Sequence, residues 1–339
     1  MVALKNAYLE LRPCMPTPFL PEWAVVMFAY RESSEVLAQS IRALLLAIRR
    51  NTVIDIIVNG NEQLASETAR FANSLKLNDH SISVSLRVWK VAQGDKAHAW
   101  NQYLYGIWEG AETVFFADGY VRVHPTSLTR ISDALERDNY ALAATGVPSQ
   151  GISAANMRRQ LVAENGLHGN LHAIRGTILT ILRQQKFILP AGIYRTDSLI
   201  GAAIKFNLDP TQYSWDPQRI HVVEDASWDH TPLSAVKLTD WITHFRRLTR
   251  QGQGVFENLA VRRHLSFYSR SLETLPETSR ELVRQWMQNH PRELLEALVK
   301  HPLAALSLKR IKKKRDWSKS VIPPFLMTKL ISTKSDEPF

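Results

Sequence analysis

The sequence has very little cysteine and no long apolar segment. Its 339 residues include one cysteine, Cys14, which excludes an intramolecular disulfide framework and any metal site with several cysteine ligands. A single cysteine fits a reducing compartment. No apolar run approaches the roughly 18 residues that a membrane-spanning helix requires. Prolines at positions 13, 16, 18 and 21 interrupt the N-terminus, so we expect no secretory signal.

The positive charge is concentrated in the last third of the chain. The net charge of +10 arises entirely after residue 236, because residues 1–236 contain 22 basic and 22 acidic residues, whereas residues 237–339 contain 20 and 10. This asymmetry indicates an anionic partner for the basic end, either a membrane surface, a nucleic acid or phosphate groups. The alternative is a basic face that is merely solvated.

Apolar runs typical of buried strands recur in the first 120 residues, and segments with helical periodicity separate them. The runs cover residues 24–30, 53–58 and 113–117, a β-rich stretch covers 81–91, and the helical segments cover 35–50, 62–76 and 96–109. This alternation predicts an α/β fold with a mostly parallel central sheet flanked by helices. Since ligands bind at the carboxyl ends of parallel strands, the residues that follow each strand are the candidates for a site.

The rest of the chain is less regular. We expect a strand at 142–147, a helix near 156–186 and an apolar stretch at 218–223, followed by a mostly helical, basic segment from about 237. These patterns suggest three parts. Residues 1–22 are irregular, residues 23–262 form the α/β domain with halves at 23–125 and 126–262, and residues 263–339 form a helical basic extension.

Short polar motifs follow the predicted strands in a distinctive order. They are Ala29-Tyr30-Arg31-Glu32, Asn59-Gly60-Asn61, Gly94-Asp95-Lys96, Asp118-Gly119-Tyr120, Gly192-Ile193-Tyr194-Arg195, Glu224-Asp225 and the basic stretch Phe245–Gly254. In this order, over about residues 23–262, the chain resembles the family 2 inverting glycosyltransferases, which have the GT-A fold. The resemblance implies transfer of a sugar from a nucleotide-diphosphate donor to a hydroxyl acceptor, which is a glycan or a lipid-linked saccharide.

The resemblance places donor-binding residues at the ends of the first strands and in the basic stretch. The segment around Tyr30 would lie against the base, and Asn59 stands where the family has an acidic residue that reads the base. Cations at the start of a helix suit a diphosphate. The donor-binding residues implied in this way are Ala29, Tyr30, Glu32, Asn59, Lys96, Asp118, Arg247 and Arg250.

Asp118 occupies the place of the D-x-D motif, which in this family binds a divalent metal. The sequence offers one carboxylate there, with Tyr120 or Phe116 in place of the other. Hard cations take several oxygen ligands. Either Mn²⁺ or Mg²⁺ binds through Asp118, the phosphates and water, or cationic side chains neutralise the diphosphate instead.

The later motifs imply an acceptor side and a general base. Gly192, Tyr194, Arg195 and Glu224 would lie beside the acceptor, and Asp225 would remove the proton from the attacking hydroxyl. Alternatively, Asp225 caps a helix that begins at residue 226. His168 and His172 have the i, i+4 spacing of a metal pair on a helix, although packing histidines are more common.

The basic extension contains a polybasic run, Lys309–Arg315, followed by Trp317 and an apolar stretch, Val321–Met327. This pattern favours an anionic membrane surface, where each Lys or Arg contributes about 1 kcal/mol. We therefore expect a cytoplasmic protein that is peripheral on the inner face of the membrane. Nucleic acid is a weaker interpretation, because no aromatic residues are interleaved with the charges.

Two further functions remain open at this point. The chain could be a degenerate GT-A domain that binds a nucleotide or glycan, or serves as a membrane scaffold, without turnover. Nucleotidyl transfer on a similar sheet is a third interpretation, but the sequence has no glycine-rich loop after the first strand.

Overall fold

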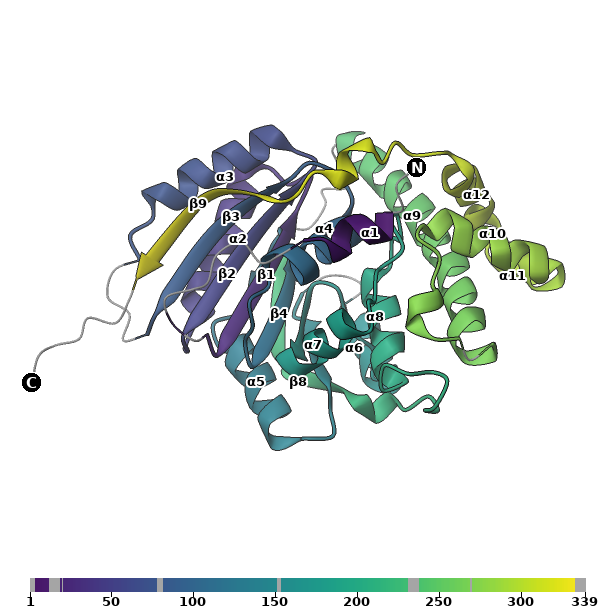
Figure 1. Cartoon of the computed structure of the whole chain (residues 1–339), viewed down its shortest axis with the longest axis horizontal. Helices are drawn as coiled ribbons and strands as arrows, with labels where there is room; N and C mark the ends of the chain where they lie inside the picture. The colour runs from purple at the N-terminus through teal and green to yellow at the C-terminus, as the bar shows by residue number, and fades with distance from the viewer. Residues whose placement is uncertain are drawn as a thin grey trace, which may run out of the picture.

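The computed structural model describes residues 4–11, 19, 21–77, 82–150, 154–230, 238–268 and 270–332, except for the side chains of 4, 238–249 and 303. A nine-stranded sheet forms the centre of the described part (Figure 1). Its order is β5-β8-β6-β7-β4-β1-β2-β3-β9. The strands are β1 (Trp23–Ala29), β2 (Thr52–Asn59), β3 (Val84–Val91), β4 (Thr113–Asp118), β5 (Val121–Val123), β6 (Ala143–Pro148), β7 (Leu171–Arg175), β8 (Ile220–His230) and β9 (Phe325–Ser332).

The sheet is mixed but mostly parallel. Strands β1, β2, β3, β4, β6 and β8 run in one direction, and β5, β7 and β9 run in the other. The predicted α/β class with a mostly parallel central sheet is therefore confirmed. Strands β1 and β2 are buried along their whole length, because helices cover both faces of the sheet.

Alternate residues of each strand enter two apolar cores. One core contains residues of α2, α3 and α5, and the other contains residues of α4, α7, α8, α9 and α10. The helices in chain order are α1 (Leu4–Leu9), α2 (Ser34–Ala47), α3 (Glu62–Ser74), α4 (Lys96–Gln102), α5 (Ser127–Arg137), α6 (Ala154–Glu164), α7 (Gly176–Gln184), α8 (Thr196–Lys205), α9 (Leu238–Arg262), α10 (Ser279–Asn289), α11 (Pro291–Lys300) and α12 (Ala305–Lys312). Within the described residues, none of these helices combines the length and apolarity needed to cross a membrane.

The helix predicted near 156–186 is wrong, because strand β7 interrupts it. Residues 171–175 pair with β4 and β6 in the sheet, and α6 and α7 lie on either side of that strand. His172 is therefore a strand residue and His168 a loop residue, so they do not form a helical i, i+4 metal pair. Instead, His172 Nδ1 lies 2.9 Å from the backbone oxygen of His168.

The extension expected to be helical also contains a strand. The end of the described chain, β9, pairs antiparallel with β3 from Val84 opposite Ser332 to Lys90 opposite Phe325 (Figure 1). Without β9, strand β3 would present an edge with unpaired backbone groups, and covering such an edge stabilises a sheet. The chain thus returns from the helices α9–α12 to the sheet of its first half.

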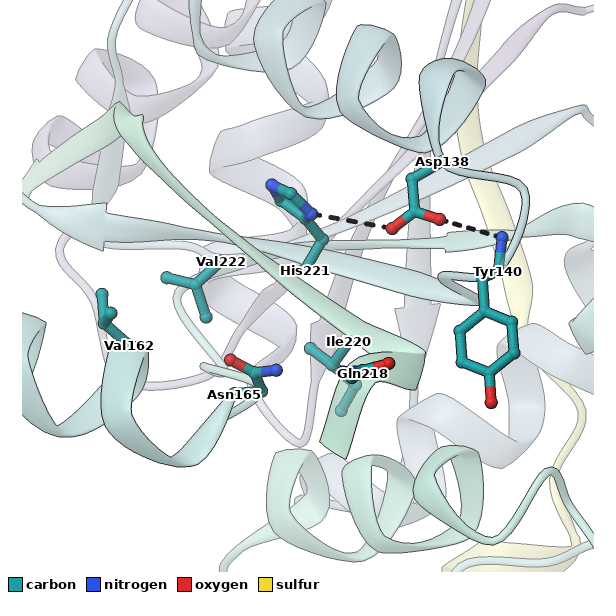
Figure 2. A pocket seen from close by; sticks show the side chains of 8 residues that line it. All are labelled: Asp138, Tyr140, Val162, Asn165, Gln218, Ile220, His221 and Val222. Carbon is teal, nitrogen blue, oxygen red and sulfur yellow. Dashed lines mark hydrogen bonds and ion pairs between the residues drawn. The ribbon is translucent and has the colours of Figure 1, made fainter. Parts of the chain in front are cut away.

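The two ends of the parallel strands differ. At their amino ends, an open pocket of about 380 Å³ lies between α6 and the start of β8 (Figure 2). It is lined by Asp138, Tyr140, Val162, Asn165, Gln218, Ile220, His221 and Val222. The polar motifs at residues 29–32, 59–61, 94–96 and 118–120 follow β1, β2, β3 and β4 and lie at the carboxyl ends, on the opposite edge of the sheet.

Candidate functional site

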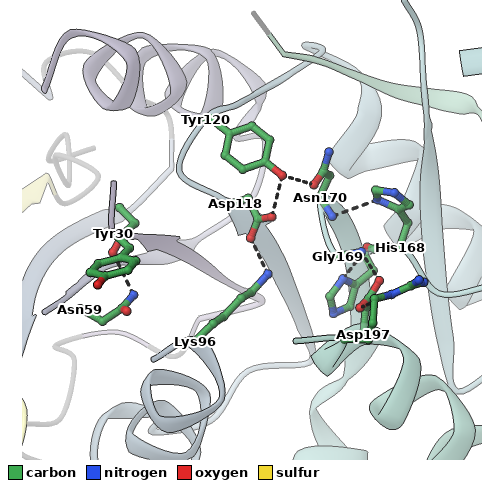
Figure 3. Close-up of polar contacts among 12 residues, drawn as sticks. Tyr30, Asn59, Lys96, Asp118, Tyr120, His168, Gly169, Asn170 and Asp197 are labelled. Atoms are coloured by element: carbon green, nitrogen blue, oxygen red, sulfur yellow. Dashed lines mark hydrogen bonds and ion pairs between the residues drawn. The ribbon is translucent and has the colours of Figure 1, made fainter. Parts of the chain in front are cut away.

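The end of β4 and the start of α4 are joined by an ion pair between Asp118 and Lys96 (Figure 3). Asp95 places Lys96, because its carboxylate caps α4 by accepting a hydrogen bond from the amide of His98 at 3.0 Å. Burial lowers the pKa of Lys96, but the Asp118 carboxylate raises it, and the net pKa lies above the usual value for lysine. Lys96 is therefore a fixed cation at the carboxyl edge of the sheet.

Both carboxylate oxygens of Asp118 have a partner. Lys96 binds Oδ1, and the hydroxyl of Tyr120 lies 3.1 Å from Oδ2. The same hydroxyl lies 2.9 Å from Oδ1 of Asn170, which belongs to the loop before β7. The described part of the chain contains no group of three histidine, cysteine, aspartate or glutamate side chains that could hold a metal ion. The residues around Asp118 therefore do not fit a metal site built from protein ligands alone.

A second carboxylate, Asp197, joins this cluster from the first turn of α8. Its Oδ2 accepts a hydrogen bond from the amide of Gly169 at 3.2 Å, and its Oδ1 lies 3.7 Å from Nε of Arg195. Burial raises the pKa of Asp197, but Arg195, His168 and Lys96 lower it, and the net pKa lies below the usual value. Asp197 is consequently an ionised, largely buried carboxylate close to Lys96.

The loop of residues 168–170 connects the two carboxylates. Its central amide, at Gly169, binds Asp197, and its last residue, Asn170, contacts Tyr120 beside Asp118 (Figure 3). The amide of Asn170 also donates to Nδ1 of His168 at 3.1 Å, and the His168 ring stacks on Trp228 at 5.2 Å. The loop is thus held by its own contacts, and it fixes Asp197 relative to Asp118.

The segment after β1 forms one side of the site. Glu32 accepts hydrogen bonds from the amides of Tyr30 at 2.6 Å and Arg31 at 2.9 Å, and burial raises its pKa. The Tyr30 ring lies against the backbone of Gly94, where an added Cβ would be 3.1 Å from the ring. The predicted donor residues Ala29, Tyr30 and Glu32 thus lie at the same edge as Lys96 and Asp118.

Asn59 has a structural contact rather than a free amide. Its side chain is buried, and its Nδ2 donates to the backbone oxygen of Ala29 at 2.9 Å, which joins the ends of β1 and β2. The following residue, Gly60, has φ +65°, and an added Cβ would lie 2.3 Å from Cα of Gly94. Glycine is therefore required where these two loops meet.

The predicted acceptor-side segment also reaches the site. The amide of Gly192 donates to Oδ1 of Asp95 at 3.2 Å, and the amide of Tyr194 donates to Oε2 of Glu257 in α9 at 2.8 Å. Arg195 follows directly and contacts Asp197. The guanidinium carbon of Arg250 lies 6.0 Å from the centre of the Tyr194 ring. The side chain of Arg247 lies outside the described residues.

Glu224 and Asp225 lie elsewhere, inside β8. The register of β8 against β6 shifts here, so that Thr145 faces Val222 and Val147 faces Ser227. This bulge turns both acidic side chains outward. Glu224 contacts Arg158, and Asp225 contacts Arg130 with Oδ2 3.4 Å from Nε. Among the described contacts, neither reaches the Lys96–Asp118 cluster. The alternative that Asp225 caps a helix is wrong, because β8 continues to His230.

Sequence reasoning missed Asp197 and Asn170. A signal for Asp197 was present, because an acidic residue follows Tyr194-Arg195-Thr196 directly and opens the apolar segment Leu199–Ile204. Acidic residues are favoured in the first turn of a helix. Asn170 had no comparable signal, since it precedes a strand that the sequence did not indicate.

No protein-family model matches the chain, and no curated protein matches its sequence. Solved structures do resemble it. The mannosyltransferase PcManGT from Pyrobaculum calidifontis, in complex with GDP-Man and Mn²⁺, has a TM-score of 0.54 at 14% identity, over 94% of this chain and 83% of that chain. S. aureus TarS 1-349 in complex with UDP-GlcNAc has a TM-score of 0.44 at 13% identity, over 86% and 89%. The first likeness shows that this chain shares the fold of that mannosyltransferase, and at this identity it shows the fold alone.

Proposed function

We propose that this chain is a glycosyltransferase of GT-A type that moves a sugar from a nucleotide-diphosphate donor to a hydroxyl acceptor with inversion. The observation that carries the proposal is the meeting of Lys96, Asp118 and Asp197 at the carboxyl edge of the parallel strands (Figure 3). Ligands of open α/β sheets bind at this edge. The arrangement offers one cation that could stabilise a leaving group and a separate carboxylate that could accept the proton of a hydroxyl acceptor.

The donor would lie across the ends of β1 and β4. The Tyr30 ring is partly exposed, packs on glycine backbone and has the Arg31 guanidinium carbon 4.8 Å from its centre, so the base of a nucleotide would contact the exposed edge of this ring. The ammonium group of Lys96 would stabilise the negative charge that develops on the departing diphosphate. We derive no step through a metal ion, because both oxygens of Asp118 already have protein partners.

Asp197 is our candidate for the general base. In a single displacement, the acceptor hydroxyl attacks the anomeric carbon and its proton passes to the base. The bond from that carbon to the diphosphate breaks, and its electron pair leaves with the phosphate. This requires an ionised carboxylate near the donor, and Asp197 is held ionised close to Lys96. Asp225, the sequence-based candidate, remains the competing assignment.

A paired substitution separates the two carboxylates. Transfer and donor hydrolysis are measured with UDP-, GDP- and dTDP-sugars, with and without Mn²⁺, for the wild type, Asp197→Asn and Asp225→Asn. We expect Asp197→Asn to lower kcat by about 10²–10⁴-fold, the usual contribution of a general base. Asp225→Asn is the matched control and should stay within about threefold. The reverse result would assign the base to Asp225.

The same assay tests the non-catalytic alternative. Donor binding in calorimetry without release of nucleotide, in the presence of glycan and lipid-linked acceptors, would refute the enzyme and favour a degenerate GT-A domain. One feature of the sequence favours that alternative, because Tyr120 stands where the D-x-D motif has its second carboxylate. The paired network around Asp197 has no evident purpose in a pure binding domain.

We also propose peripheral attachment to the inner face of a membrane through residues 309–327. Lys312, Lys313 and Lys314 are exposed, and Val321 and Phe325 expose apolar side chains nearby in the chain. Because β9 belongs to the sheet, truncation would damage the fold, so the test is a triple Lys→Gln substitution at 312–314. We expect the variant to lose co-sedimentation with anionic vesicles at constant thermal stability. Retained co-sedimentation would refute the attachment.

A further inference from the structure

The C-terminal segment crosses the loop that precedes Lys96. Arg315 lies after α12, and its Nη1 is 3.3 Å from Oδ2 of Asp95. The next residue, Asp316, accepts a hydrogen bond through its backbone oxygen from Nε2 of Gln93 at 3.3 Å. The basic extension therefore reaches the candidate site itself, on the side of the loop that positions Lys96.

Besides Arg315, three arginines from other parts of the chain bear on this site, namely Arg31, Arg250 and Arg310. The guanidinium carbon of Arg31 is 4.8 Å from the centre of the Tyr30 ring, and that ring rests on Gly94. Arg310 lies near the end of α12. Burial lowers the pKa of Arg310, and Arg315, Arg250 and Arg31 lower it further, whereas Glu257 in α9 raises it. Segments far apart in sequence thus bring guanidinium groups together at the edge that carries Lys96.

The cluster has a surplus of positive charge. Asp95 pairs with Arg315, but neither Arg31 nor Arg310 forms a salt bridge within the described residues. Like charges gathered in this way repel one another unless an anion lies between them. Guanidinium groups match phosphate oxygens through parallel hydrogen bonds, so the missing anion is best supplied by phosphate.

We propose that Arg31, Arg310 and Arg315 form, beside Lys96, the binding site for the diphosphate group of the donor, so that the C-terminal segment completes the donor site. This inference rests on the proposed function and specifies which cations neutralise the diphosphate where the D-x-D position has a single carboxylate. Phospholipid headgroups share the phosphate chemistry. The position beside Tyr30 and Lys96, at the carboxyl edge of the sheet, favours the nucleotide diphosphate.

Inorganic pyrophosphate is a suitable probe, because it carries no base or sugar. Its binding is measured by calorimetry in EDTA for the wild type, Arg31→Gln, Arg310→Gln and Arg315→Gln. Arg292→Gln is the matched control, because this exposed arginine of α11 has no salt bridge within the described part of the chain. We expect each site variant to weaken binding about tenfold and the control less than twofold. The binding of UDP and GDP should weaken in the same way in the site variants, whereas the substitutions should not change the binding of uridine and guanosine.

The outcomes separate this inference from the proposed function. Arginine-dependent pyrophosphate binding without any sugar transfer would uphold the anion site and refute the enzyme. Sugar transfer with pyrophosphate binding unchanged in all three variants would overturn the anion site and leave the enzyme intact. Loss of binding to anionic vesicles in these variants, with pyrophosphate binding unchanged, would assign the arginines to a lipid surface and overturn the proposal. Absence of pyrophosphate binding to the wild type would also overturn it. Arg31 and Arg310 have exposed side chains, so these variants should keep the wild-type melting temperature.

Discussion

Glu257 is a fully buried carboxyl group whose ionisation should change the stability of the fold with pH. It lies on α9 and accepts hydrogen bonds from the amide of Tyr194 at 2.8 Å, from Nε2 of Gln253 at 2.7 Å and from the hydroxyl of Ser279 at 2.8 Å. Burial raises its pKa from 4.5 to about 7, although these donors oppose the shift. The perturbation is Glu257→Gln, which keeps the size and removes the titration.

The raised pKa of Glu257 determines whether the stability of the fold rises or falls with pH. The folded protein holds the proton up to about pH 7, whereas the unfolded chain releases it near pH 4.5. The stabilisation is therefore fully present below pH 4.5 and is lost as the pH rises through 7. A difference of 2.5 pKa units corresponds to about 3 kcal/mol. With an unfolding entropy of about 2 cal/mol/K per residue over 339 residues, this lowers Tm by about 4–5 °C.

The assay is thermal and urea unfolding between pH 4.5 and 8 for the wild type, Glu257→Gln and the exposed control Glu296→Gln. His98, His172 and His264, whose burial lowers each pKa to about 4, titrate in all three proteins and cancel in the difference. We expect the stability of the wild type relative to Glu257→Gln to fall by about 3 kcal/mol across this range. Parallel pH profiles for these two proteins would refute the reasoning.

Three further perturbations test the fold and the site. Asp55→Ala removes two hydrogen bonds, of 2.7 Å and 2.9 Å, from the buried guanidinium of Arg87 and leaves Glu109 as its remaining carboxylate partner, so urea unfolding should show a loss of about 3 kcal/mol. Adding Arg87→Met and Glu109→Gln, which removes the whole charged group, should restore much of that loss, and a loss below about 1 kcal/mol in Asp55→Ala alone would contradict this prediction. Gly176→Ala brings a Cβ within 1.8 Å of the backbone oxygen of Ala111, so Tm should fall in step with a loss of about 1–3 kcal/mol. Lys96→Met should lower kcat for sugar transfer by about 10²–10³-fold without a change in Tm, and an unchanged kcat would remove Lys96 from the mechanism.

The sequence predicted the first four long strands because each is a mainly apolar or β-rich stretch bounded by turn residues. Burial on both faces imposes that pattern, so it is visible without knowledge of the fold. Strand β7 was not predicted because polar residues flank it and helical segments adjoin it on both sides. Strand β9 was hidden because its burial is partial, and its strand conformation depends on pairing with the edge of β3.

The residues of the site also divide into those that a local sequence pattern indicates and those that only tertiary contacts bring to the site. Tyr30, Lys96 and Asp118 could be predicted to lie together, because each directly follows a strand or opens the helix after one, and parallel strands end at a common edge. Asp197 and Arg315 reach that edge only through tertiary contacts. The sequence suggested Asp225 as the general base because the acidic pair Glu224-Asp225 follows an apolar run. The strand in fact continues past this pair through a bulge that no local pattern indicates.

Asp95 links the three parts that converge on the site. Its Oδ1 accepts hydrogen bonds from the amides of His98 and Gly192, and its Oδ2 pairs with Arg315. One buried carboxylate therefore fixes the start of α4, the segment that leads to Asp197, and the C-terminal arginines. The position of Lys96 depends on the first of these contacts, that of Asp197 on the second and that of the guanidinium cluster on the third. The proposed donor and acceptor residues are thus positioned against a common point, which accounts for a site assembled from segments more than 200 residues apart.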